Sequence, residues 1–207
     1  MKVLLINGSP HKEGCTYTAL TEIAGELEKC GVESEIFWLG TAPICSCLGC
    51  GACKKTGKCF MDDAVNDFIA RAAEFDGFIF GSPVHFAGAT GAISSFMSRA
   101  FYSGRAVLEG KAGACISSAR RGGCTATFDQ LNKFLTISNM VVVGSQYWNM
   151  VHGNTPDEVR QDGEGLQTMR TLGRNMAWII KCIQAGKDAG INFPTMEEEK
   201  IRTNFIR

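Results

Sequence analysis

The sequence predicts an α/β protein in which a five-stranded parallel sheet lies between two layers of helices. Short apolar runs alternate with helical patterns five times along the 207 residues. These runs lack a polar face, which is typical of strands that are buried on both sides. With the first strand in the centre, the expected strand order is 2-1-3-4-5, and ligands of such sheets bind beyond the carboxyl ends of strands 1 and 3.

The first half of the chain contains three apolar segments that predict strands, and a helical pattern follows the first and the third. A further helical pattern follows Asp62-Asp63, which can cap a helix. Gly31 is typical of the residue that ends a helix. The expected strands are residues 3–6, 33–38 and 76–81, and the expected helices contain Leu20/Ile23/Ala24/Leu27, Val65/Phe68/Ile69/Ala72 and residues 90–102.

The second half of the chain repeats the alternation and ends in a long helix. Strands are expected at residues 111–118 and 140–144, with a helix at 125–138 between them. A long irregular stretch follows and contains a capping box, Thr155-Pro156-Asp157-Glu158. The last helix carries a Met/Ile stripe that indicates core packing. We therefore expect one domain over residues 1–187, with a cysteine-rich insertion at 40–60, and a C-terminal tail or intersubunit arm at 188–207.

The loop between the first strand and the first helix, Gly8 to Thr18, has the composition of an anion-binding turn. Helix N-termini present free N–H groups and a positive dipole end, and the hydroxyls of Ser9, Thr16 and Thr18 can donate further hydrogen bonds. Five residues separate its glycines and Cys15 follows, so it is not a Walker A loop, and G-x-G-x-x-G is absent. A terminal monophosphate, as in FMN, fits better; an ordinary capped turn is the alternative.

Composition excludes several classes of function. Lysines and arginines total 21, as do aspartates and glutamates, so no basic surface for nucleic acid or an anionic membrane is expected. No apolar run approaches the roughly 20 residues of a membrane span, and the N-terminal apolar run is too short for a signal peptide. We expect a cytoplasmic protein, in which the ten cysteines are metal ligands, redox groups or buried thiols rather than a disulfide framework.

Four cysteines form the sharpest chemical signal, Cys47-x2-Cys50-x2-Cys53-x5-Cys59. Two-residue gaps let successive thiolates converge on one centre, and a fourth thiolate nearby completes the ligand set of a [4Fe–4S] cluster. A zinc site usually has two separate C-x2-4-C pairs, which this spacing resembles less well. The same spacing is also compatible with free thiols, with adventitious disulfides and with a relict motif that no longer holds a cluster.

The ordered set of these motifs resembles a known family. Gly8-Ser9-Pro10 leading to Thr16, then Ser82-Pro83-Val84, then Arg120-Arg121-Gly122-Gly123 are similar to the flavodoxin-like NAD(P)H-dependent FMN reductases. The four cysteines followed by Asp62-Asp63 resemble the iron–sulfur flavoprotein branch of this family. The likeness covers nearly the whole chain and implies a flavodoxin-like fold and FMN as cofactor.

The resemblance also implies positions for the flavin. The phosphate site falls on Ser9, His11, Cys15 and Thr16, where the family commonly has a basic residue at the position of His11 and an asparagine at that of Cys15. Pro83, Val84, His85 and Phe86 match the segment along the isoalloxazine ring, where Phe86 or His85 can pack on the ring face. Pro83 as a strand terminator and Phe86 as a core aromatic are the alternatives. Residues Ala119, Arg120, Gly122 and Gly123 would approach the pyrimidine side, with Arg120 stabilising negative charge there.

The implied activity is that of an FMN-dependent oxidoreductase that takes hydride from NAD(P)H and passes electrons to a quinone, a free flavin or an iron–sulfur centre. No catalytic side chain is required, because flavin N5 carries the chemistry. One alternative is an electron carrier that works with a ferredoxin-like partner, and another is a flavin-binding redox sensor. A homodimer or homotetramer is expected, because flavin lies near a subunit contact in the family.

Overall fold

A computed structural model describes residues 1–194, 197–199 and 201–203 of the chain, and its centre is a twisted parallel sheet. Five strands are hydrogen-bonded in the order β2-β1-β3-β5-β6. They are β1 (Lys2–Asn7), β2 (Glu33–Trp38), β3 (Gly77–His85), β5 (Ala112–Ala119) and β6 (Val141–Val142), all parallel. Counted along the chain, these are the five expected strands in the expected order, so the predicted 2-1-3-4-5 topology is confirmed.

Two short strands bring the sheet to seven rather than the expected five. β4 (Gly88–Ala89) pairs antiparallel with β3, and β7 (Met150–His152) pairs in parallel with β5 beyond the point where β6 ends. The expected loop over residues 82–88 is therefore a hairpin, and the expected irregular stretch after residue 144 contains a strand. Neither strand has the length or alternation that a sequence pattern could reveal.

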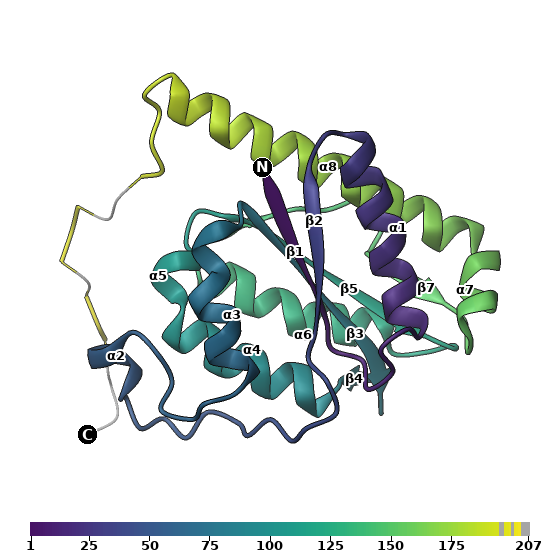
Figure 1. Cartoon of the computed structure of the whole chain (residues 1–207), viewed down its shortest axis with the longest axis horizontal. Coiled ribbons are helices and arrows are strands. Elements are labelled where there is room, and N and C mark those ends of the chain that lie inside the picture. Colours follow the sequence, from purple (N-terminus) through teal and green to yellow (C-terminus); the bar gives the residue numbers. More distant parts are fainter. Residues whose placement is uncertain (195–196, 200, 204–207) are drawn as a thin grey trace.

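Helices cover both faces of the sheet (Figure 1). α1 (Cys15–Lys29) and α8 (Gly163–Asp188) pack on one face, and the short α7 (Pro156–Gln161) lies beside them. α3 (Ala64–Arg71), α4 (Gly91–Ser103) and α6 (Cys124–Ile137) pack on the other face. The remaining short elements are α2 (Cys53–Thr56), the 3-10 turn η1 (Ala72–Glu74) and α5 (Arg105–Leu108).

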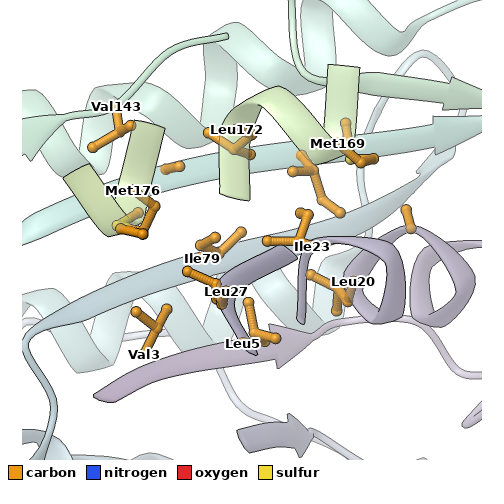
Figure 2. Packing of buried hydrophobic residues seen from close by; sticks show 14 of the residues in the cluster. Val3, Leu5, Leu20, Ile23, Leu27, Ile79, Val143, Met169, Leu172 and Met176 are labelled. Carbon is orange, nitrogen blue, oxygen red and sulfur yellow. The ribbon is translucent and has the colours of Figure 1, made fainter. Parts of the chain in front are cut away.

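Alternate residues of the central strands enter two separate cores, as the pleat requires. On the α1/α8 face, the strand residues Val3, Leu5 and Ile79 pack against the two helices. Figure 2 shows the helical residues that meet them, which include the predicted stripes of both helices: Leu20, Ile23, Leu27, Met169, Leu172 and Met176. All of these side chains are fully buried, which confirms the helical stripes as core.

The opposite core is aromatic. Phe78 and Phe80 of β3 point to this face together with Leu4 and Ile6 of β1. The ring of Phe68 on α3 lies 5.5 Å from that of Phe78 and 5.2 Å from that of Phe96, both in edge-to-face geometry, which is favourable for aromatic pairs. This core holds α3 and α4 against the sheet and so determines where the two loops before them lie.

The predicted helix ends are largely confirmed. The Asp63 side chain caps α3 by accepting a hydrogen bond from the Val65 N–H, and the Thr155 hydroxyl caps α7 by accepting one from the Glu158 N–H. Residues 189–194, 197–199 and 201–203 of the expected tail have no helix or strand, and the Phe193 ring lies against Gly110. The rest of that tail, residues 195–196, 200 and 204–207, lies outside the described residues.

Among the described residues, no helix combines the length and the hydropathy that a membrane span requires.

Candidate flavin and iron–sulfur sites

The N-terminus of α1 lacks a side-chain cap, unlike those of α3, α4, α7 and α8. Its N-cap residue is Gly14, and its first turn contains no acidic residue. The free N–H groups and the positive end of the helix dipole therefore face the Gly8 loop without an internal carboxylate or hydroxyl to satisfy them. An anion such as a phosphate fits this end of the helix.

The Gly8 loop is held tightly on the sheet. The Gly8 N–H donates to the Gly81 carbonyl oxygen at 2.9 Å, and the Thr90 hydroxyl donates to the Gly8 carbonyl oxygen at 3.0 Å. A Cβ at Gly8 would lie 2.7 Å from the Ile93 side chain and 2.9 Å from the Gly81 oxygen, so only glycine fits. The loop after β1 is thus fixed both to β3 and to the N-cap of α4.

The residues that are predicted to bind phosphate differ in which hydrogen bonds their side chains already make. Ser9 is buried, and its hydroxyl accepts a hydrogen bond from the His11 N–H at 3.1 Å. The hydroxyl of Thr16 is paired with that of Ser118 at 2.8 Å, and the hydroxyl of Thr18 donates to the Gly14 carbonyl at 3.1 Å. Thr16 and Thr18 therefore already have partners within the protein, while the backbone N–H groups of the first turn are the donors that point outward.

His11 and Cys15 lie at the same loop. His11 is exposed, whereas the half-buried Cys15 thiol lies 3.6 Å from the Gly153 carbonyl oxygen, to which it donates a weak hydrogen bond. Burial raises the pKa of the Cys15 thiol above its ordinary value, so the thiol stays protonated at neutral pH. A neutral thiol does not repel a phosphate.

The second predicted segment forms a β-hairpin whose tip is strained. Val84 pairs with Ala89 and His85 pairs with Gly88, so Phe86 and Ala87 form a two-residue loop. Both have positive φ, 50° and 59°, as a type I′ turn requires. Asn and Gly usually supply this conformation, and other residues adopt it at a cost of about 1–2 kcal/mol each.

The Phe86 side chain is fully exposed at this tip, at 107%, which excludes the alternative that it is a core aromatic. Pro83 does not terminate β3 either, because the strand continues to His85 and Pro83 is in register with Ser118 of β5. A strained, outward-pointing aromatic tip is typical of a functional segment.

The third predicted segment follows β5 and begins α6. α6, like α1, has no side-chain cap and no acidic residue in its first turn, and its N-cap is Gly123 at φ +95°. A Cβ there would lie 2.7 Å from both the Ala87 Cα and the Val84 Cγ1, so the third segment contacts the hairpin. Ala119 is buried at the end of β5, and Arg120 and Gly122 are exposed. The structure thus brings the three predicted flavin segments together at one edge of the sheet.

The four cysteines of the predicted metal site line one cavity of about 220 Å³, together with Arg99 and Tyr102 of α4. None is in a disulfide. In the part of the chain that the structure describes, no three Cys, His, Asp or Glu side chains converge closely enough to hold one metal ion. In a [4Fe–4S] cluster each thiolate binds a different iron, so the four sulfur atoms lie around the cluster and do not converge on a single ion.

Several residues of these sites escaped the sequence analysis. Trp38 at the end of β2 donates from Nε1 to the Ser9 carbonyl oxygen at 2.8 Å, and the Lys12 ammonium lies 5.9 Å from the centroid of its ring. Gln130 of α6 accepts from the Ala89 N–H at 3.0 Å and so supports the hairpin. Of these residues, only Arg99 could have been found from the sequence. It lies among apolar residues of its predicted helix, where a charged residue indicates a buried ion pair.

Comparisons with known proteins match most of the chain to one family. Residues 1–155 match the family described as NADPH-dependent FMN reductase. An iron–sulfur flavoprotein of Methanocaldococcus jannaschii is 34% identical over 192 residues, which cover 89% of this chain and 100% of that protein. An iron–sulfur flavoprotein of Methanosarcina thermophila is 27% identical over 195 residues, which cover 91% of this chain and 100% of that protein.

Among solved structures, a flavodoxin from the domain Archaea superposes with a TM-score of 0.60 at 15% identity, covering 87% of this chain and 99% of that chain. At this level of identity the likeness concerns the fold, and it agrees with the strand order and helix layers described above.

Proposed function

The chain belongs to the family of NADPH-dependent FMN reductases, and from this premise we propose that it binds FMN, takes hydride from NAD(P)H and passes electrons to a small acceptor. Membership in the family makes it a flavin oxidoreductase. We propose further that the reductant is NADPH or NADH. The electron acceptor would be a quinone, a free flavin or an iron–sulfur centre.

The observation that supports the proposal best is the uncapped N-terminus of α1 beside the Gly8 loop. Its first-turn N–H groups would bind the FMN phosphate, aided by the positive end of the helix dipole. Ser9, His11, Cys15, Thr16 and Thr18 line this loop. We assign phosphate binding to its backbone more than to its three hydroxyls, each of which already has a hydrogen-bond partner within the protein.

The other two segments would hold the ring. When bound, FMN would supply the redox chemistry, which is to accept hydride from the reductant and to pass electrons on to the acceptor. Pro83, Val84 and His85 present backbone along one side, and the exposed Phe86 can cover a face of the ring. Arg120 would place positive charge near the pyrimidine side, with Ala119, Gly122 and Gly123 shaping the loop. No side-chain acid or base of the chain is needed for hydride transfer.

We also propose that Cys47, Cys50, Cys53 and Cys59 hold a [4Fe–4S] cluster, which would store and release single electrons. The shared cavity and the all-thiol donor set support this assignment, and curated relatives are named iron–sulfur flavoproteins. α4 links the two sites, because its cap residue Thr90 contacts the Gly8 loop while Arg99 and Tyr102 line the cysteine cavity.

The test is an absorption spectrum with iron and sulfide assays on protein purified anaerobically, followed by titration with FMN and then with NADPH or NADH. Flavin bands that bleach rapidly with reduced nicotinamide would support the proposed reaction. Failure to bind added FMN would overturn the assignment of the Gly8 loop. Flavin without iron or sulfide would leave a simple FMN reductase and remove the cluster.

The cysteine cavity favours a second candidate, an electron carrier that exchanges single electrons with a ferredoxin-like partner. Bleaching of the flavin by reduced ferredoxin but not by NAD(P)H would select this candidate over the first. If neither reduces the flavin and thiol oxidation changes the oligomeric state, a redox sensor becomes the better assignment. The expected homodimer or homotetramer and the cytoplasmic location stay predictions, and sedimentation velocity tests the former.

A further inference from the structure

Arg99 on α4 is a charged side chain in the interior of the protein. Only 1% of its surface is exposed, and its neighbours on the helix, Phe96 and Ala100, are fully buried. Burying a guanidinium is costly unless it is paired and hydrogen-bonded. Its partners should therefore explain why an arginine stands at this position.

The Arg99 guanidinium binds the segment from Cys59 to Asp63. Nε donates to the Cys59 sulfur at 3.3 Å, Nη1 donates to Asp63 Oδ2 at 2.5 Å, and Nη2 donates to the Met61 carbonyl oxygen and to Asp63 Oδ1 at 2.9 and 3.0 Å. Two of these bonds form a bidentate pair with the Asp63 carboxylate, the geometry that arginine favours. The third nitrogen is thereby aimed at a single sulfur.

Cys59 is also fixed through its backbone. Its N–H donates to Asn66 Oδ1 at 3.0 Å, and its carbonyl oxygen accepts from Asn66 Nδ2 at 2.9 Å. Side chains from α3 and α4 therefore hold this cysteine. By contrast, the Cys47 sulfur accepts only a local hydrogen bond from the Gly49 N–H at 3.5 Å, the Cys53 sulfur lies 4.0 Å from the Tyr102 carbonyl oxygen, and Cys50 is exposed. Among the four cysteines, Cys59 is the one that the fold holds in place most firmly.

We propose that Arg99 is a positioning residue that holds the Cys59 sulfur as a preformed cluster ligand, and that Arg99 and Asp63 tune the reduction potential of the cluster in opposite directions. This inference rests on the cluster proposed above. Hydrogen bonds to ligand sulfurs and nearby charge are established determinants of cluster potential.

The signs follow from electrostatics. Reduction adds one electron, and therefore one negative charge, to the cluster, with the electron supplied by an external donor. The Arg99 cation beside a ligand sulfur favours this extra charge, and the effect is strong because the guanidinium is shielded from water. The Asp63 carboxylate partly cancels it. Removing the cation should lower the potential, and removing the carboxylate should raise it.

The test uses full-length protein whose cluster is reconstituted anaerobically with iron and sulfide, in three variants. Arg99→Gln removes the cation, and Arg99→Lys keeps the charge but loses the planar fork that reaches Asp63 and sulfur together. Asp63→Asn is the matched partner, since asparagine has nearly the same shape and still caps α3. Iron and sulfide per chain are measured first, then the midpoint potential by dithionite titration followed by low-temperature electron paramagnetic resonance.

We expect Arg99→Gln to hold less iron and sulfide per chain and to shift the potential downward, Arg99→Lys to shift it less, and Asp63→Asn to shift it upward. A purely structural role predicts another pattern, in which the variants lose iron and thermal stability but the clusters that remain keep the wild-type potential. Unchanged potentials, or shifts of the same sign in Arg99→Gln and Asp63→Asn, would overturn the inference. If Arg99→Gln does not fold, an unchanged potential in Asp63→Asn is sufficient to reject it.

Failure of the cluster itself is distinguishable. A wild-type protein that takes up neither iron nor sulfide would overturn both the cluster proposal and this inference, while an FMN titration of the same sample would still report on the flavin site. A wild-type cluster with variants that match it in content and potential would reject the role of Arg99 alone.

Discussion

At the scale of single residues, Gly123 lets the second and third of the predicted flavin segments contact each other. It has φ +95°, and a Cβ would lie 2.7 Å from the Ala87 Cα. At its neighbour Gly122, a Cβ would have no heavy atom within 4 Å, and the backbone φ there is not positive. The two adjacent glycines therefore form a matched pair. Contact and backbone conformation require glycine at position 123, whereas neither requires it at position 122.

We expect Gly123→Ala to destabilise the protein by about 2 kcal/mol or more, because a side chain at positive φ is strained and the contacted atom is backbone that must shift. Urea unfolding of the FMN-free protein measures this change. Gly122→Ala is the control and should stay within about 0.5 kcal/mol of wild type. Equal effects of the two substitutions would show that the hairpin does not press on the start of α6.

At the scale of elements, the N-terminus of α1 lacks the side-chain groups that usually stabilise a helix start. A helix N-terminus gains from a cap and from acidic residues in its first turn, and α1 has neither. The other helices of eight or more residues have side-chain caps except α6, which begins at the same edge of the sheet. The two uncapped ends follow β1 and β5, the neighbours of β3. The three segments predicted to bind flavin lie there.

A carboxylate in the first turn of α1 should therefore have opposite effects on stability and on FMN. Tyr17 occupies the third position of the helix, where glutamate is favourable. We expect Tyr17→Glu to weaken FMN binding about tenfold through repulsion of the phosphate, while the FMN-free protein keeps or gains thermal stability relative to Tyr17→Gln. Fluorescence titration with FMN and thermal unfolding measure the two quantities.

Tyr17→Gln is the matched control, because it removes the same ring without adding charge. If the glutamine and glutamate variants bind FMN equally, the phosphate does not lie at this end of α1. A titration with riboflavin, which lacks the phosphate, should show no difference between them in either case.

At the scale of the whole molecule, ion pairs join α1 to α8 across the helical layer. Glu26 is buried, and its carboxylate accepts hydrogen bonds from Lys29 at 2.6 Å and from Arg174 of α8 at 2.9 Å. The Lys29 hydrogen bond, followed by Arg174 and the two positive charges, outweighs burial and lowers the pKa of Glu26 below its ordinary value. Folding is therefore linked to the ionisation of this carboxylate.

The sign of the linkage defines the pH window. Because the folded pKa is lower than the unfolded value of about 4.3, the stabilisation is complete above that value and is lost as the pH falls through the folded pKa. We expect Glu26→Gln to be less stable than wild type at pH 7, with a difference that shrinks below about pH 4.3. Denaturant unfolding of both proteins from pH 7 to pH 3 measures this.

Glu28→Gln serves as the control, because Glu28 is on the same helix but exposed and the substitution changes the net charge equally. A difference between wild type and Glu26→Gln that stays constant down to pH 3 would show that the ionised carboxylate does not contribute to the stability of the α1/α8 layer.

The sequence alone determined the parts of this protein that depend on local pattern. Burial on both faces predicted the parallel strands and their order, helical spacing predicted the core stripes of α1 and α8, and Asp63 and Thr155 marked helix starts. That the three predicted flavin segments lie together also follows from this pattern, because parallel strands bring their carboxyl ends to one edge. The spacing of the cysteines indicated a shared centre, and they do line one cavity.

Only the tertiary structure decided the features that join distant residues or strain the backbone. The Phe86-Ala87 turn lacks the Asn or Gly that signals a hairpin, so its conformation comes from the pairing of β3 with β4 and from Gln130 on α6. The contact between Arg99 and Cys59 joins residues 40 positions apart. No periodicity records such a pairing, because it arises when the aromatic core packs α3 and α4 against the sheet and brings the segment before α3 beside α4.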